Sequence, residues 1–92
     1  MEKIHIHTFC DIIDAELIVR RYPNQQDRWT AQIDHSQIKE DMMLISAYGD
    51  GTTPREALSA YLDQIRGKLL IIHAFDEKLR REYHVPENIC SD

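Results

Sequence analysis

A shortage of basic residues and of long apolar runs limits what this 92-residue protein can do. Eleven Lys and Arg side chains stand against sixteen Asp and Glu, which leaves a formal net charge of −5. Such a balance argues against non-specific DNA binding, which needs a basic surface. The apolar run "LLIIHAF" stops after seven residues, which is too short to span a bilayer. We therefore expect no membrane partner, and we read no signal peptide in "MEKIHIHTFC".

Cysteine is also scarce. Cys10 and Cys90 lie near opposite ends of the chain, and they could in principle form a bridge. Without a secretion signal, two reduced thiols in a cytoplasmic protein are the expected state. The sequence does not say whether the two ever pair.

Glycine occurs three times. Gly49 and Gly51 flank Asp50 just before a predicted helix, where free N–H groups can bind a phosphate. However, the third glycine of a dinucleotide-binding motif and the Gly-Lys-Ser/Thr of a P-loop are both absent, and Asp50 would repel an anion. We expect the two glycines to turn the chain tightly from a strand into the helix.

The predicted fold is a single α+β domain, residues 1–92, with one small core. Alternating or branched apolar patterns predict an antiparallel sheet of about five to six strands. A loop is predicted over 35–41, and a loose tail over 87–92. The expected strands are 3–8, 15–22, 28–34, 42–48, 68–75 and 79–85, of which the second and third form a hairpin.

One amphipathic helix is predicted at about 54–66, packed on one face of the sheet. Thr53 is a good N-cap, Pro54 suits the first helical position, and Glu56 completes a capping box. Gly67 stands where a left-handed C-terminal residue belongs. The apolar stripe of this helix comprises Ala57, Leu58, Tyr61, Leu62 and Ile65.

No catalytic or metal-binding motif accompanies these elements. His5 and His7 share one face of the first predicted strand and could supply two zinc ligands, as in a small metal-dependent hydrolase, but no further ligand completes a known spacing. The candidate nucleophiles stand in no defined relation to a base. We predict a protein that is not an enzyme and has no metal, cofactor or small-molecule substrate. The candidate nucleophiles considered are Cys10, Ser36, Ser46 and Ser59.

Arginine beside aromatic residues gives the strongest indication of a binding surface. Arginine can grip phosphate while a neighbouring ring stacks on a base, which suits single-stranded RNA. The alternative is a set of solvated strand edges whose charges block aggregation. Acidic residues such as Asp34, Glu82 and Glu87 interleave with the basic ones, which suits a mixed protein and nucleic-acid partner. The candidate binding residues are Arg20, Arg21, Arg28, Trp29, Arg80, Arg81 and Tyr83.

Two segments, "YGDGTTPREALSAYLDQIRGKLLI" and "RREYHVPENI", resemble small proteins encoded by phages and mobile elements. Within that group, the length and layout resemble phage anti-CRISPR proteins of the type I-F inhibitor group. The resemblance implies a non-enzymatic inhibitor in the cytoplasm of the host bacterium. Such an inhibitor binds the CRISPR–Cas surveillance ribonucleoprotein, made of Cas subunits and guide RNA, and blocks its capture of target DNA. The arginines would then meet guide RNA or acidic protein surface.

A second resemblance is to HicB-type antitoxins, in which strands are followed by a Gly-x-Thr-x-Glu-Glu-Ala-Leu helix start. The segment "GTTPREAL" (51–58) is close to that pattern. This resemblance implies a module that covers the active face of a toxin.

Overall fold

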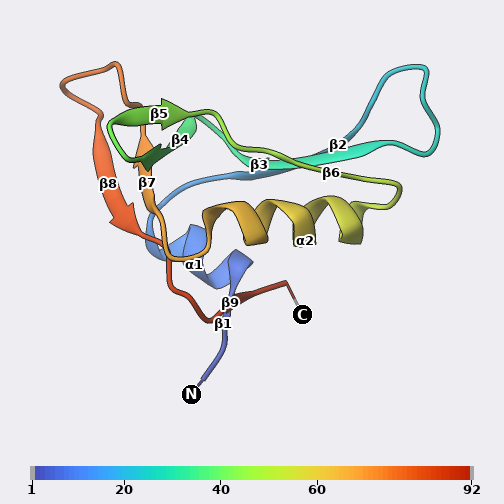
Figure 1. Cartoon of the computed structure of the whole chain (residues 1–92), viewed down its shortest axis with the longest axis horizontal. Coiled ribbons are helices and arrows are strands. Elements are labelled where there is room, and N and C mark those ends of the chain that lie inside the picture. Colours follow the sequence, from blue (N-terminus) through green and yellow to red (C-terminus); the bar gives the residue numbers. More distant parts are fainter. Residues whose placement is uncertain (1, 92) are drawn as a thin grey trace.

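The structure is a computed structural model that describes residues 2–91. Within this range the chain forms three small sheets and two helices, rather than one sheet of five to six strands with one helix (Figure 1). The α+β class is as predicted. The elements are β1 (Ile4–His5), α1 (Ile6–Ile12), β2 (Leu17–Arg21), β3 (Trp29–Ile33), β4 (Ser36–Glu40), β5 (Met43–Ile45), β6 (Gly49–Gly51), α2 (Pro54–Ile65), β7 (Leu69–Ile72), β8 (Arg81–His84) and β9 (Ile89–Cys90).

The first sheet is antiparallel with strand order β2-β3-β6. Its β2–β3 hairpin is the one expected from the sequence, with Arg21 opposite Trp29. Helix α2 packs along one face, as Figure 1 shows. Thr53 caps this helix by accepting from the Glu56 N–H at 3.1 Å, and Gly67 follows its end with φ of 72°. The helix prediction is confirmed.

Gly49 and Gly51 do not form the predicted turn, because they are themselves strand residues of β6. Their small size serves the close approach of α2. A Cβ added to Gly49 would lie 1.9 Å from the Ala57 carbonyl oxygen, and one on Gly51 would lie 2.6 Å from the Ala57 nitrogen. Both distances are shorter than any real carbon contact. The glycines therefore allow sheet and helix backbones to touch.

The second sheet has strand order β5-β4-β7-β8, with antiparallel pairing throughout. Its strand β4 occupies most of the predicted loop 35–41, so that prediction is wrong. Ser36 and Ile38 point inward and are buried, whereas Gln37 is only partly buried and Lys39 is exposed. This is a short alternation, and the polar composition of "HSQIKED" conceals it.

The segments near the two chain ends pair with each other and pack against the common core. Strand β1 covers two residues and pairs in parallel with β9, and the predicted strand 3–8 is otherwise replaced by α1. The buried residues Ile6, Phe9, Cys10 and Ile13 follow the i, i+3, i+4, i+7 spacing of a helix. The predicted loose tail is also wrong over residues 87–91: Ile89 is buried, and the Arg66 guanidinium donates to the carbonyls of Glu87 and Ile89.

The core lies between α1, α2 and the inner faces of the two larger sheets. Tyr61 of α2 stands at its centre and is fully buried. Its hydroxyl accepts from the Ile33 N–H at 3.0 Å, and Ser36 lies beside it. This contact joins α2 to the point where β3 passes from the first sheet into β4 of the second.

Candidate binding surface

The β2–β3–β6 sheet exposes the face opposite α2. Side chains alternate between the two faces of a strand, and Ala31, Gly49 and Ile33 face the helix side. The residues between them must therefore point outward. We call this outward surface the open sheet face; it comprises Ile18, Arg20, Tyr22, Arg28, Thr30, Gln32, Tyr48 and Asp50.

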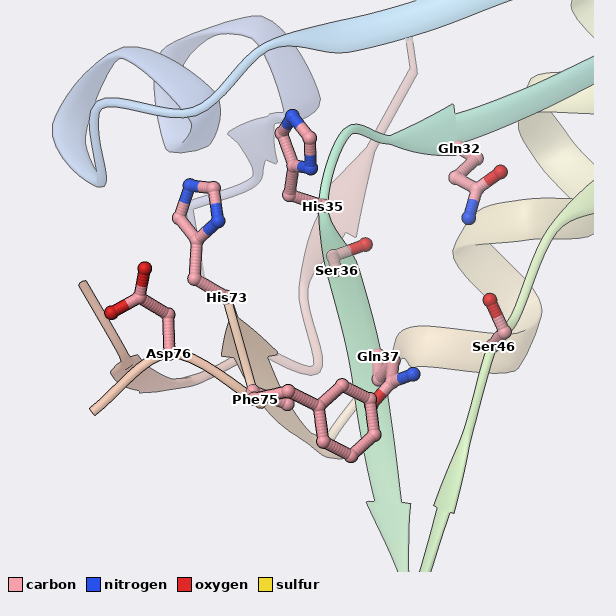
Figure 2. Close-up of a pocket in the computed structure, with 9 residues that line it drawn as sticks. Gln32, His35, Ser36, Gln37, Ser46, His73, Phe75 and Asp76 are labelled. Carbon is pink, nitrogen blue, oxygen red and sulfur yellow. The ribbon is translucent and has the colours of Figure 1, made fainter. Parts of the chain in front are cut away.

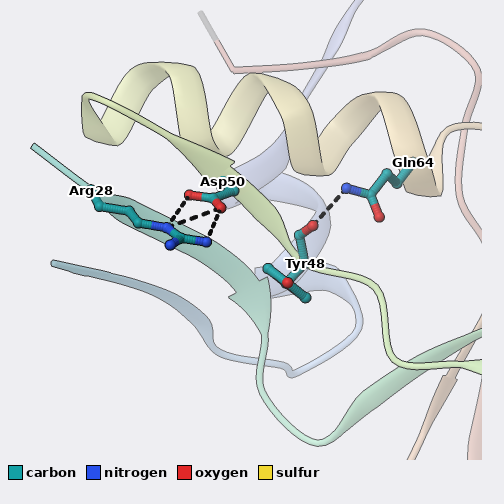
Figure 3. A network of polar contacts seen from close by, with 4 residues as sticks. All are labelled: Arg28, Tyr48, Asp50 and Gln64. Atoms are coloured by element: carbon teal, nitrogen blue, oxygen red, sulfur yellow. Dashed lines mark hydrogen bonds and ion pairs between the residues drawn. The ribbon is translucent and has the colours of Figure 1, made fainter. Parts of the chain in front are cut away.

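Arg28 lies at one end of the open sheet face, where its side chain contacts both Asp50 and Tyr22. Its Nη2 donates to the Asp50 carboxylate at 2.8 Å, and its Nε lies 3.2 Å from the same oxygen (Figure 3). Its Cζ lies 4.6 Å from the centroid of the Tyr22 ring. The three side chains thus form a stacked, fork-like contact that fixes the guanidinium plane.

The electrostatics follow from this contact. Hydrogen bonds and negative charge from Asp50 raise the pKa of Arg28, and the nearby Tyr22 and Tyr48 contribute in the same direction. The ion pair is about half exposed, with 46% and 38% of the two side chains accessible. It therefore contributes little to stability, but together with the Tyr22 ring it forms an ordered polar and aromatic patch on the exposed face. Tyr48 is fixed nearby through its carbonyl, which accepts from Gln64 Nε2 at 2.6 Å.

The predicted arginine set is only partly brought together. Arg20 lies on the open sheet face opposite Thr30, whereas Arg21 and Trp29 point to the other side. The residue directly across from Arg28 is Tyr22, whose N–H donates to the Arg28 carbonyl at 2.8 Å. The sequence predicts that Arg20 or Arg21 lies near Arg28. In the structure Arg20 is the one on the same face as Arg28, and it lies diagonally across the hairpin from it.

Arg81 and Tyr83 belong to β8 of the other sheet, and Arg80 directly precedes that strand. Arg80 pairs with Glu82 at 2.8 Å. Arg81 donates to the Ile13 carbonyl at 2.8 Å and to the Asp14 carbonyl at 3.3 Å, just after α1 ends. Arg81 therefore anchors β8 to the end of that helix and has less capacity left for a partner.

The candidate binding residues predicted from the sequence do not include Tyr22, Tyr48 or Asp50. A usable signal existed for Tyr22, because it follows Arg20 by two residues and so lies on the same strand face. From the sequence alone, Asp50 is expected only to repel anions. Its pairing with Arg28 depends on the register between β3 and β6, in which Thr30 faces Asp50.

A pocket of about 410 Å³ lies elsewhere, between the β3–β4 turn and the segment after β7 (Figure 2). His35 and His73 stack there with ring centroids 4.6 Å apart, and both adopt left-handed backbone conformations. Ser36 also lines this pocket, but its hydroxyl donates to the Ile33 carbonyl at 2.5 Å. The Ser36 hydroxyl is thus used in the fold.

The histidines and cysteines considered as metal ligands or nucleophiles also take part in the fold. His5 caps α1 by accepting from the His7 N–H at 3.2 Å, so the two histidines do not share a strand face. Cys10 is buried and forms no disulfide, and burial raises the pKa of its thiol to about 11. Across residues 2–91, no three His, Cys, Asp or Glu side chains cluster in a way that could hold a metal ion. Within the same residues, neither helix is long and apolar enough to cross a membrane.

Comparisons with protein-family models, curated proteins and solved structures gave no match to this chain.

Proposed function

We propose that this protein is a non-enzymatic inhibitor that acts by binding, with the open sheet face as its docking surface. The observation that carries the proposal is the ordered contact of Arg28 with Asp50 and Tyr22. It is exposed, fixed in geometry and not needed to hold the core. Exposed arginine and tyrosine side chains are typical of residues that dominate binding energy at interfaces.

The partner we propose is a type I-F CRISPR–Cas surveillance ribonucleoprotein, in keeping with the resemblance of residues 44–89 to phage anti-CRISPR proteins. The open sheet face favours the Cas subunits over guide RNA as the contacted component. Asp50 already neutralises Arg28, and the whole chain carries a net charge of −5. A phosphate group would have to displace a bidentate carboxylate, whereas a protein surface can use the pair, the tyrosines and the neighbouring polar side chains together.

Co-purification tests this proposal. The tagged chain is expected to retain a type I-F surveillance complex at a fixed stoichiometry and to reduce the binding of that complex to its target DNA. A chain with native circular dichroism that neither retains the complex nor affects DNA binding would contradict the proposed partner.

The second candidate is an antitoxin-like module. The observation that favours it is that the three strands of one sheet precede α2, which begins within the "GTTPREAL" segment. In this case the open sheet face would cover a toxin. The gene neighbourhood separates the two candidates cheaply, and neutralisation of a toxin encoded by an adjacent gene, without any effect on the surveillance complex, would favour the antitoxin.

A further inference from the structure

Strand β2 forms an edge of its sheet, because it pairs with β3 on one side only. Within residues 2–91, β3 and α2 are the elements that pack extensively against it. The Asp34 N–H donates to the Glu16 carbonyl, and the Tyr22 N–H donates to the Arg28 carbonyl. Hydrogen-bonded positions alternate along an antiparallel strand, so the even-numbered residues bond to β3. The N–H and C=O groups of Leu17, Val19 and Arg21 therefore point to the open edge.

The sequence of this edge is complementary to itself. We propose that β2 pairs antiparallel with β2 of a second copy, about a two-fold axis at Ile18. In this register Leu17 lies opposite Val19 of the second copy, where both have free backbone groups and exchange both N–H···O bonds. The inference concerns the association of two copies and does not rest on the proposed function.

Side chains support the same register on both faces. On the open sheet face, Ile18 meets Ile18 of the second copy across the axis. On either side of Ile18, Glu16 of one copy lies opposite Arg20 of the other. The two-fold axis repeats this contact, so two cross-strand ion pairs form. Directly opposed apolar and opposite-charge pairs both stabilise a sheet. On the other face the half-buried Leu17 and Val19 continue the apolar layer across the junction.

Neighbouring registers lack this match. Moving the axis to Val19 places Arg20 opposite Ile18 and leaves Glu16 opposite Tyr22. Moving it to Leu17 places Arg20 opposite Asp14, which lies outside the strand and has a left-handed φ of 54°. The register centred on Ile18 thus pairs Arg20 with Glu16, which directly precedes β2 and still bonds to Asp34 across the hairpin. It joins the two open sheet faces into one continuous surface, as in other isologous dimers.

Charge reversal provides a direct test in the full chain. By sedimentation equilibrium, the parent is expected to be a dimer. Glu16→Arg places arginine opposite Arg20, and Arg20→Glu places glutamate opposite Glu16. Each variant alone should raise the dimer dissociation constant at least about tenfold. An equimolar mixture restores both ion pairs and should form a heterodimer of intermediate charge, seen by ion exchange and native mass spectrometry.

Hydrogen exchange provides the internal control for folding. The amides of Leu17 and Val19 should exchange slowly in the parent dimer and quickly in either single variant. Those of Ile18 and Arg20, which face β3, should stay protected in all samples. A parent that is monomeric at millimolar concentration would overturn the inference. So would a dimer that survives both single reversals, or a mixture that forms no heterodimer.

Discussion

The two larger sheets use arginine beside tyrosine in different ways. In the β2–β3–β6 sheet, Arg28 lies over Tyr22 and pairs with Asp50 on the exposed face. In the β5–β4–β7–β8 sheet, Arg81 lies 5.8 Å from the Tyr83 ring and donates to backbone carbonyls at the end of α1. The first arrangement leaves a surface available for a partner, and the second fastens two elements together. An arginine beside a tyrosine is therefore consistent with the proposed binding role only where its guanidinium does not bond to the backbone of another element.

The largest expected effect concerns the helix-facing side of the first sheet. Gly49→Ala should lower the free energy of unfolding by ~3 kcal/mol or more, because its Cβ would overlap the backbone of α2. Gly67→Ala is the matched control. Gly67 has a positive φ, but its new Cβ would meet only the movable Glu87 side chain, so a loss of ~1 kcal/mol is expected. Chemical denaturation measures both, and a larger loss for Gly67→Ala would refute the close-approach explanation.

The core shared by the two sheets should make stability depend on alkaline pH. Burial, with a smaller contribution from Asp11, raises the pKa of the Cys10 thiol from 9.0 to about 11. Above pH 9 the unfolded chain loses this proton while the folded chain keeps it. This thiol therefore leaves stability unaffected below pH 9 and lowers it as the pH rises towards 11, by roughly 2–3 kcal/mol.

Cys10→Ala should remove most of that decline, as followed by urea denaturation at several pH values. Burial also raises the pKa of Tyr61, so a smaller decline should remain at the highest pH. A Cys10→Ala profile identical to that of the parent would show that the thiol is not the group responsible.

Removal of the anchoring arginine should have a moderate effect. Arg81→Ala leaves the carbonyls of Ile13 and Asp14 without their donor, which should cost ~1–2 kcal/mol. Arg80→Ala is the comparison: it removes an exposed ion pair with Glu82 and a single exposed hydrogen bond to the Ala74 carbonyl, and should cost ~0.5 kcal/mol or less. Thermal unfolding compares the two variants. Equal melting temperatures would mean that Arg81 is no more structural than its neighbour.

The smallest stability effect is expected on the open sheet face. The double variant Arg28→Ala plus Asp50→Ala keeps the net charge and leaves no unpaired ion. Its free energy of unfolding should differ from that of the parent by about 0.5 kcal/mol or less. A substantial loss in thermal denaturation would mean that this pair serves the fold, as Arg81 does.

Local signals predicted the β2–β3 hairpin and α2, but not β6, whose glycines were expected to form a turn. Thr53, Pro54 and Gly67 mark the helix ends whatever surrounds them, and the β2–β3 hairpin follows from alternation along two adjacent runs. The candidate site was less predictable, because its central contact joins Arg28 to a residue 22 positions away. That contact depends on how β6 pairs with β3, which no local pattern specifies.

The errors elsewhere arose where two periodicities compete. The alternation of Ile4, His5, Ile6 and His7 predicts a strand, but the spacing of Ile6, Phe9 and Cys10 equally fits a helix, and burial of that stripe decides the outcome. The sequence does not reveal β4 because its outward residues are polar, and because one of its two neighbours, β7, is distant in sequence. Tertiary packing, rather than local preference, fixed both segments.

The affinity for the type I-F surveillance complex, compared between two charge-neutral double variants, tests the central claim most directly. Arg28→Ala plus Asp50→Ala removes the ordered pair from the open sheet face. Glu77→Ala plus Lys78→Ala removes an exposed opposite-charge pair from the segment between β7 and β8. The account predicts a Kd at least about tenfold higher for the first variant, with unchanged melting temperature, and parental affinity for the second. Parental affinity in both variants, or no binding by the parent, would contradict the claim that the open sheet face docks on this complex.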